Sequence, residues 1–108
     1  MKIDLPYVHS GKVRDIYDAG QNQLLMVTSD RLSAFDVVLN EPITHKGRVL
    51  TTMSEFWFDY FADVVPSHLL STDLDEVAPL LGGNPYPDLA GRIMLCRRAE
   101  MLPIECIV

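Results

Sequence analysis

The first segment whose residues could perform chemistry covers residues 10–17 and reads Ser-Gly-Lys-Val-Arg-Asp-Ile-Tyr. Gly11 would let a ligand approach the backbone closely, and the alternation of Lys12 and Arg14 would place both cations on one face of a strand. Two cations beside a glycine turn suit a polyphosphate, because phosphate oxygens accept charge-assisted hydrogen bonds. The pattern is not a Walker loop, however, so on the pattern alone a surface hairpin with solvated charges is the simpler interpretation.

A second polar segment, residues 29–36, reads Ser-Asp-Arg-Leu-Ser-Ala-Phe-Asp and lies between two apolar runs. Polar groups in such a position need hydrogen-bond partners, since leaving them buried and unpaired is costly. The carboxylates of Asp30 and Asp36, together with the hydroxyls and Arg31, could bind Mg²⁺ or hold a polar substrate. The simpler interpretation is that Asp30 and Ser33 cap turns.

Two further segments could contact a ligand through their backbone. Residues 44–47 precede a predicted helix, where free N–H groups beside Lys46 would form an anion site. Pro103 interrupts strand pairing within residues 101–105 and would leave nearby backbone groups free for a ligand, although an ordinary kink at a strand edge explains it as well. The three histidines show no spacing typical of a metal site.

The composition is that of an ordinary soluble domain. With 108 residues the chain is long enough for one core, and its 48% hydrophobic and 22% charged residues are typical of globular proteins. The net charge of −6 argues against binding to nucleic acid or to an anionic membrane. Cys96 and Cys106 lie in apolar runs, which favours two buried, reduced thiols. Without an apolar span or a signal peptide in the sequence, we expect a cytoplasmic protein.

The elements that would position these residues predict an α+β domain, an antiparallel β-sheet lobe with one main helix. Short strands at 7–10, 12–17 and 23–28 predict a meander. Apolar and aromatic residues at helical spacing predict a helix from Gly47 to about Ala62, and we interpret its aromatic stripe as core packing. The other expected elements are strands at 37–39, 68–72 and 92–98, a weak helix at 74–81 and a loop at 82–87.

The last eight residues, 101–108, form an apolar, strand-like run with no turn, cap or polar tail. Chain termini commonly fray into polar, loosely held residues. We therefore expect this run to lead into a further part of the protein, so that these 108 residues carry only part of the chemistry they serve.

Taken together, the motifs resemble the N-terminal part of one family, phosphoribosylaminoimidazole-succinocarboxamide (SAICAR) synthetase of purine biosynthesis, and the resemblance covers essentially the whole chain. Five motifs occur in order: residues 10–17, residues 29–36, Lys-Gly-Arg-Val-Leu-Thr at 46–51, Ser-Glu-Phe-Trp-Phe at 54–58 and Met-Leu-Pro-Ile-Glu-Cys at 101–106. The last resembles the first half of the family's Leu-Pro-Ile-Glu signature, which continues into an Arg and a Gly-Ser pair.

The resemblance implies a fold and a division of the chain. Residues 1–100 would form an N-terminal, ATP-covering lobe similar to the small lobe of a protein kinase. Residues 101–108 would begin the hinge to a larger C-terminal domain that this chain does not contain, in an ATP-grasp-like arrangement with ATP between the two lobes. An isolated lobe would expose apolar cleft surface, so we expect that it self-associates.

The resemblance also implies site residues. The segment Gly11, Lys12, Val13 and Arg14 would cover the triphosphate. The adenine pocket would have Ile16, Leu25 and Val27 among its walls, and the backbone of Met101, Leu102 and Ile104 would contact the adenine edge. The motif positions near the cleft are Asp36, Lys46 and Glu105, which with Lys12 and Arg14 are candidate catalytic residues without assigned roles. The acidic metal-binding motif of the family lies outside these 108 residues, so no metal ligand is expected within the chain.

The implied reaction joins L-aspartate to carboxyaminoimidazole ribonucleotide with ATP, giving SAICAR, ADP and phosphate, with Mg²⁺ as the metal. The chain would supply at most half of that active site and would be inactive alone. Two alternatives remain: a stand-alone lobe that binds nucleotide without catalysis, and a kinase-type enzyme, which would explain the fold but not the order of the motifs.

Overall fold

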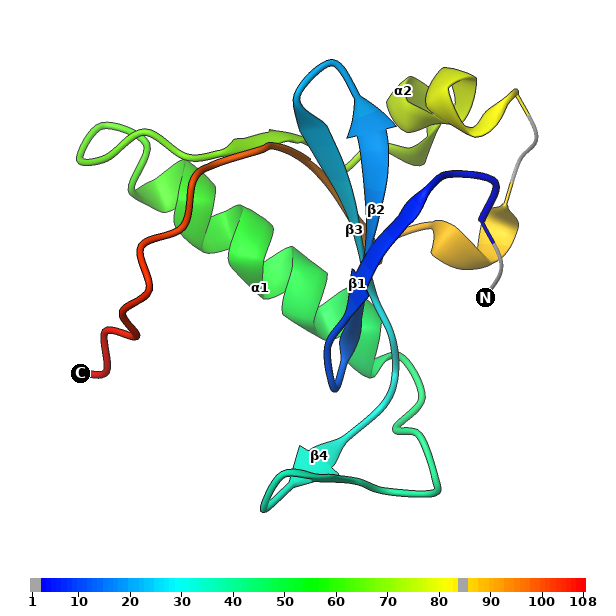
Figure 1. Cartoon of the computed structure of the whole chain (residues 1–108), viewed down its shortest axis with the longest axis vertical. Helices are drawn as coiled ribbons and strands as arrows, with labels where there is room; N and C mark the ends of the chain where they lie inside the picture. Colours follow the sequence, from blue (N-terminus) through cyan, green and yellow to red (C-terminus); the bar gives the residue numbers. More distant parts are fainter. Residues whose placement is uncertain (1–2, 84–85) are drawn as a thin grey trace.

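The computed structural model describes residues 3–83 and 86–108, and a five-stranded antiparallel sheet with the order β1-β2-β3-β7-β6 organises the fold. A single long helix, α1, crosses one face of the sheet, and short helices cover the other (Figure 1). The predicted α+β lobe with one main helix is confirmed. The strands of the sheet are β1 (Tyr7–Ser10), β2 (Arg14–Gly20), β3 (Gln23–Thr28), β6 (Leu69–Ser71) and β7 (Ile93–Arg97). The helices are α1 (Lys46–Tyr60), α2 (Leu74–Val77), η1 (Ala78–Leu81) and η2 (Pro87–Leu89).

Strand β2 begins two residues later than predicted and continues further. Gly11 donates its N–H to the carbonyl of Arg14 at 2.7 Å, so residues 11–13 form the turn between β1 and β2 rather than the start of a strand. At its far end β2 runs to Gly20, and a tight turn through Gln21 and Asn22, both with positive φ, leads into β3. Lys12 therefore lies in a turn, and the argument from strand alternation does not apply to it.

The main core lies on the face of the sheet opposite to α1. Cross-strand partners share a face, and Leu25 of β3 pairs with Tyr17 of β2 and with Leu95 of β7. All three are buried, and helices α2, η1 and η2 cover them with Val77, Leu81 and Leu89. Removing this apolar surface from water contributes roughly 25 cal/mol per Å² to folding. The remaining core residues are Ile3, Val27 and Ile93.

Helix α1 exposes much of its aromatic stripe, so the prediction of core packing is wrong there. Its buried residues are Gly47 and Thr51, whereas Trp57 is 48% exposed and Tyr60 is 65% exposed. The rings pack on one another along the helix instead, as with Phe56 and Tyr60, whose centroids lie 6.0 Å apart. The physical reason is that helical periodicity shows which residues share a face but not whether anything covers that face.

A small hairpin interrupts the chain between β3 and α1 and extends away from the sheet (Figure 1). Its strands are β4 (Ser33–Ala34) and β5 (Val37–Val38), where a single brief strand at 37–39 was predicted. The two residues at its tip, Phe35 and Asp36, both have positive φ, at 50° and 65°. Two such residues form the tight turn whose twist suits a two-residue hairpin, although Phe is an unusual residue for it.

The segment after β7 forms no strand, so the strand-like interpretation of residues 101–108 is wrong. It leaves the sheet as an extended, exposed segment (Figure 1), and Met101 is 85% exposed and Ile107 84% exposed. An apolar run forms a strand only when a neighbouring strand takes its hydrogen bonds, and none of the described strands does so. Cys106 is likewise exposed, contrary to prediction, whereas Cys96 is buried and its burial raises the pKa of its thiol to about 11.

Candidate functional site

The turn between β1 and β2, the predicted phosphate loop, is held in place by the segment that follows β3. Ser29 donates its N–H and its hydroxyl to the carbonyl of Val13, at 2.9 and 2.8 Å. Arg31 donates Nε to the carbonyl of Lys12 at 3.0 Å. The motifs at 10–17 and 29–36, separate in the sequence, therefore meet in one loop structure, which we call the glycine loop (residues 10–14).

Lys12, on the glycine loop, forms an ion pair with Asp36 at the tip of the β4–β5 hairpin. Both side chains are open to solvent, at 50% and 88% exposure. The hydrogen bond from Lys12, and then its charge, lower the pKa of Asp36 below the usual value. The structure thus brings together two predicted site residues. An exposed pair of this kind is weak and exchangeable, so an anionic ligand could compete with Asp36 for Lys12.

Arg14 lies on the face of the sheet that α1 crosses. Its partner on β3 is Thr28, and both line a hollow of about 370 Å³ between the sheet and α1. Among the described residues, Arg14 makes no ion pair within the chain. The other residues lining this hollow are Val13, Leu50, Met53, Ser54, Trp57 and Met94.

The three predicted adenine-wall residues lie on two different faces of the sheet. Ile16 pairs with Met26 and shares the α1 face with Arg14 two residues before it. Leu25 and Val27 lie on the opposite face, in the core, at 0% and 3% exposure. Because neighbouring residues of a strand point to opposite faces, Ile16 cannot form one wall with the other two. Ile16 therefore faces α1 whereas Leu25 and Val27 face the core, and the role of the three beside the adenine stays a prediction.

An ion pair between Asp30, just after β3, and Arg92, just before β7, lies beside the start of α1. Arg92 donates to both carboxylate oxygens of Asp30, at 2.8 and 3.3 Å. The same carboxylate accepts the N–H groups of Gly47 at 2.9 Å and His45 at 3.3 Å. The hydrogen bond from Arg92, with the N–H of Gly47, lowers the pKa of Asp30 to about 2 even though desolvation opposes this.

The start of α1 was predicted as an anion site, and the anion observed there is Asp30 itself. Asp30 was predicted, with Ser33, to cap a turn, whereas its carboxylate accepts N–H groups at the start of α1. Lys46 is partly exposed, and in the described parts of the chain its side chain makes no ion pair. The signal for this pairing was present in the sequence, as a carboxylate between apolar runs needs a partner, but Arg92 lies 62 residues away.

The predicted hinge residues follow β7 and are exposed. Met101, Leu102, Ile104 and Glu105 all lie in the exposed segment after β7. Within residues 3–83 and 86–108, Glu105 takes part in no ion pair. Their predicted role stays a prediction.

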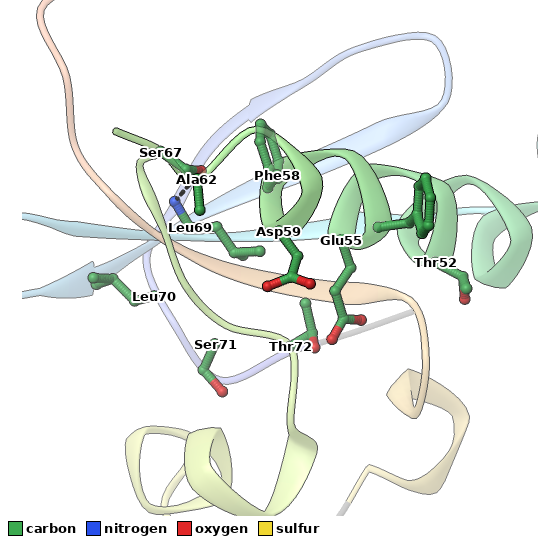
Figure 2. A pocket seen from close by; sticks show the side chains of 11 residues that line it. Thr52, Glu55, Phe58, Asp59, Ala62, Ser67, Leu69, Leu70, Ser71 and Thr72 are labelled. Atoms are coloured by element: carbon green, nitrogen blue, oxygen red, sulfur yellow. Dashed lines mark hydrogen bonds between the residues drawn. The ribbon is translucent and has the colours of Figure 1, made fainter. Parts of the chain in front are cut away.

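A larger hollow of about 680 Å³ lies between the second half of α1 and β6. Figure 2 shows the carboxylates of Glu55 and Asp59 projecting from α1 into it, toward Ser71 and Thr72. Over the residues that the structure describes, no group of three or more His, Cys, Asp or Glu side chains is arranged to hold a metal ion. Nor is any described helix both long and apolar enough to cross a membrane.

Comparisons with known proteins agree with one another. A sequence model of the SAICAR synthetase family matches residues 7–108. The phosphoribosylaminoimidazole-succinocarboxamide synthase of Syntrophotalea carbinolica is 60% identical over 106 residues, covering 97% of this chain and 35% of that protein. The protein of that name from Trichlorobacter lovleyi is 55% identical over 105 residues, covering 96% of this chain and 34% of its own length.

A solved structure gives the same result. SAICAR-synthase from Saccharomyces cerevisiae, complexed with SAICAR, aligns with a TM-score of 0.80 and 36% identity. The alignment covers 90% of this chain and 35% of the yeast chain. The chain therefore spans about a third of the length of the relatives that it matches.

Proposed function

The chain belongs to the SAICAR synthetase family, and from this premise we propose that it forms the ATP-covering, N-terminal lobe of a ligase that joins L-aspartate to carboxyaminoimidazole ribonucleotide. The products are SAICAR, ADP and phosphate. Residues 1–100 form the lobe, and residues 101–108 begin the hinge to a larger domain. The protein works in the cytoplasm and needs neither nucleic acid nor a membrane.

The glycine loop carries this proposal. In the described structure no acceptor takes the N–H groups of Lys12 and Val13, whereas protein donors take the loop's carbonyls. Successive free N–H groups beside a lysine suit phosphate oxygens. Gly11 supports the same interpretation, because a Cβ there would lie 3.6 Å from the nearest backbone atom, an ordinary contact. The fold itself does not demand glycine at position 11, which is what the close approach of a ligand would explain.

The adenine ring lies, in this proposal, on the α1 face of the sheet. Ile16 stays in the pocket wall, and its neighbours on that face are Met26 and Met94 rather than Leu25 and Val27. Met26 pairs with Ile16 on one side and with Met94 on the other, so the three form a continuous apolar row. Arg14, on the same face and at the end of the glycine loop, is then placed to reach the phosphates. The hinge backbone at Met101, Leu102 and Ile104 contacts the adenine edge once the larger domain orders it.

Lys12 and Arg14 act in the reaction by positioning phosphates and neutralising charge, which is most of what phosphoryl transfer requires. The γ-phosphoryl group passes to the carboxylate of the ribonucleotide, releasing ADP. The aspartate amine then attacks the acyl phosphate, forming the amide and releasing phosphate. Mg²⁺, when bound, would supply further positive charge that offsets the charge of the phosphates. In this proposal its protein ligands come from outside these residues.

The test is a chimera in which these 108 residues replace the matching segment of the Syntrophotalea carbinolica relative, to which they are 60% identical. We expect aspartate-dependent release of ADP from the chimera and none from the 108-residue chain alone. A chimera that folds and binds both other substrates, yet releases no ADP, would contradict the proposal. Activity of the 108 residues alone would contradict the claim that the lobe is only part of the site. ATP binding without activity in the chimera would favour the alternative, a nucleotide-binding lobe without catalysis.

A further inference from the structure

Arg31 makes three contacts with the glycine loop and its base. Its Nε donates to the carbonyl of Lys12 at 3.0 Å, and its Nη2 lies 3.4 Å from the carbonyl of Gly11. The same Nη2 pairs with the carboxylate of Asp15 at 3.0 Å. One guanidinium therefore connects two successive carbonyls of the loop with Asp15, near the start of β2.

With Arg31 in place, every carbonyl from residue 11 to residue 14 is taken by a donor of this chain. Arg31 binds those of Gly11 and Lys12, and the Ser10 hydroxyl also lies 3.4 Å from that of Gly11. Ser29 binds that of Val13, and the N–H of Gly11 binds that of Arg14. Phosphate and carbonyl oxygens repel each other, so a loop that binds phosphate must turn its carbonyls away from the ligand. The contacts of Arg31 satisfy this requirement at Gly11 and Lys12.

Asp15 and Ser10 hold the guanidinium in this position. The hydroxyl of Ser10 donates to the carboxylate of Asp15 at 2.5 Å, and Arg31 binds the same oxygen. Burial acts to raise the pKa of Asp15, but the hydrogen bond from Ser10 and the Arg31 guanidinium lower it overall. The side chains of Arg31 and Asp15 are 35% and 17% exposed, so the pair is better shielded than Lys12 and Asp36.

We propose that Arg31 is a positioning residue for phosphate binding: it holds the carbonyls of Gly11 and Lys12 away from the ligand, so that the N–H groups of Lys12 and Val13 can bind phosphate oxygens. This rests on the proposed function of the glycine loop. Arg31 acts through the planar fork of its guanidinium, which bonds several acceptors at fixed angles. Lysine keeps the charge but cannot bind the two carbonyls and Asp15 in the same geometry.

The test uses the ¹⁵N-labelled 108-residue chain, inorganic tripolyphosphate as the ligand, and the variants Arg31→Ala and Arg31→Lys. Arg98→Ala is the matched control, because Arg98 pairs with Asp18 at the other end of β2 and its loss changes the net charge equally. Two quantities are measured by NMR: the exchange rate of the Gly11 amide, which reports the loop, and the dissociation constant of tripolyphosphate. Unchanged amide signals of β3 and β7 establish that each variant is folded. If Arg31→Ala does not fold, Arg31→Lys provides a milder change.

In the unaltered chain, tripolyphosphate should shift the amide signals of Lys12 and Val13 and leave the Nε signal of Arg31 in place. Both Arg31 variants should speed Gly11 exchange and weaken tripolyphosphate binding by about 10-fold or more, since charged hydrogen bonds each contribute roughly 1.5–3 kcal/mol. The control should change either quantity by less than about 3-fold, as expected for an exposed ion pair.

Tripolyphosphate binding that Arg31→Lys leaves unchanged would overturn the proposal, because only charge would then matter. Gly11 exchange that Arg31→Ala leaves unchanged would overturn it as well, because Arg31 would not shape the loop. A third outcome is that Gly11 exchange rises in the Arg31 variants but the unaltered chain binds no tripolyphosphate. The proposed phosphate-binding function of the loop would then be contradicted, while the role of Arg31 in shaping the loop would be upheld.

Discussion

Arg92 and Asp30 form a two-pronged ion pair, in which the two terminal nitrogens of Arg92 contact the two carboxylate oxygens of Asp30 at 2.8 and 3.3 Å. The Arg92 side chain is 10% exposed and that of Asp30 is 23% exposed. Since Asp30 also accepts the N–H of Gly47, this pair fixes the start of α1 against the end of β3. Asp30 also belongs to residues 29–31, the segment whose Ser29 and Arg31 hold the glycine loop.

Replacing Arg92 with Lys should lower the free energy of unfolding by about 2–3 kcal/mol, because lysine cannot satisfy both oxygens of a largely buried carboxylate. The measurement is urea unfolding followed by circular dichroism. Arg98→Lys is the control, since Arg98 pairs with Asp18 at 3.7 Å with both side chains more than 40% exposed, and it should cost less than about 1 kcal/mol. Equal losses in the two variants would show that Arg92 is not a structural residue.

The stability that Asp30 contributes should depend on pH. Its pKa falls from 3.8 to about 2 on folding, so the charged form favours the folded state, and this contribution is complete above about pH 4 and lost as the pH falls to about 2. After allowance for screening by solvent it amounts to about 1–2 kcal/mol. Asp30→Asn lacks this titration. The difference in unfolding free energy between the chain and this variant should therefore shrink between pH 4 and pH 2, and a constant difference would contradict the assignment.

Replacement by alanine should reduce the free energy of unfolding far more at Gly47 than at Gly11. A Cβ at Gly47 would lie 2.8 Å from Nη1 of Arg92 and 2.9 Å from the carbonyl of Ser29, so Gly47→Ala must displace backbone or break the ion pair. We expect a loss of about 3 kcal/mol or more in unfolding free energy. Gly11→Ala meets only an ordinary contact and should change stability by less than about 1 kcal/mol, while weakening ATP binding in the chimera. A large loss of stability in Gly11→Ala would remove the functional argument for that glycine.

The exposed aromatic face of α1 should drive association of the isolated chain, because apolar patches of this kind favour burial against another surface. Trp57→Glu should weaken that association about 10-fold or more, measured by light scattering over a range of concentrations. The control is Phe35→Glu, which changes an exposed aromatic side chain outside α1, at the tip of the β4–β5 hairpin, and should have little effect. A monomer at every concentration would contradict this prediction.

Local patterns in the sequence predicted most of the fold, and the failures share one cause. Strand β3 occupies the predicted residues, and α1 lies within two residues of its predicted bounds, because alternation and helical spacing are local signals. The exposure of Trp57 and the lack of a strand at residues 101–108 depend on what lies next to these segments in space. A pattern of apolar residues shows a preference for burial without showing which surface, if any, provides it.

The candidate site was predictable to a similar degree. The sequence indicated Lys12 and Arg14 as cations beside a glycine turn, and Asp36 as a carboxylate in a second polar segment. That Asp36 pairs with Lys12, that Arg31 ties down the loop, and that Asp30 pairs with a residue 62 positions away all depend on tertiary contacts. The positions of Ile16 on the α1 face and of Leu25 in the core could not be predicted either, because strand register decides the face of every residue and a shift by one residue exchanges the two faces.

The central claim, that the glycine loop binds the phosphates of ATP, is tested most directly by the KM for ATP of the chimera with Lys12→Ala. Arg97→Ala, at the exposed end of β7, serves as the control of equal charge. We predict that Lys12→Ala raises this KM by about 10-fold or more, because a charge-assisted contact to phosphate is lost, while Arg97→Ala leaves it within about 2-fold. A KM for ATP that Lys12→Ala does not change would contradict the phosphate-binding role of the loop.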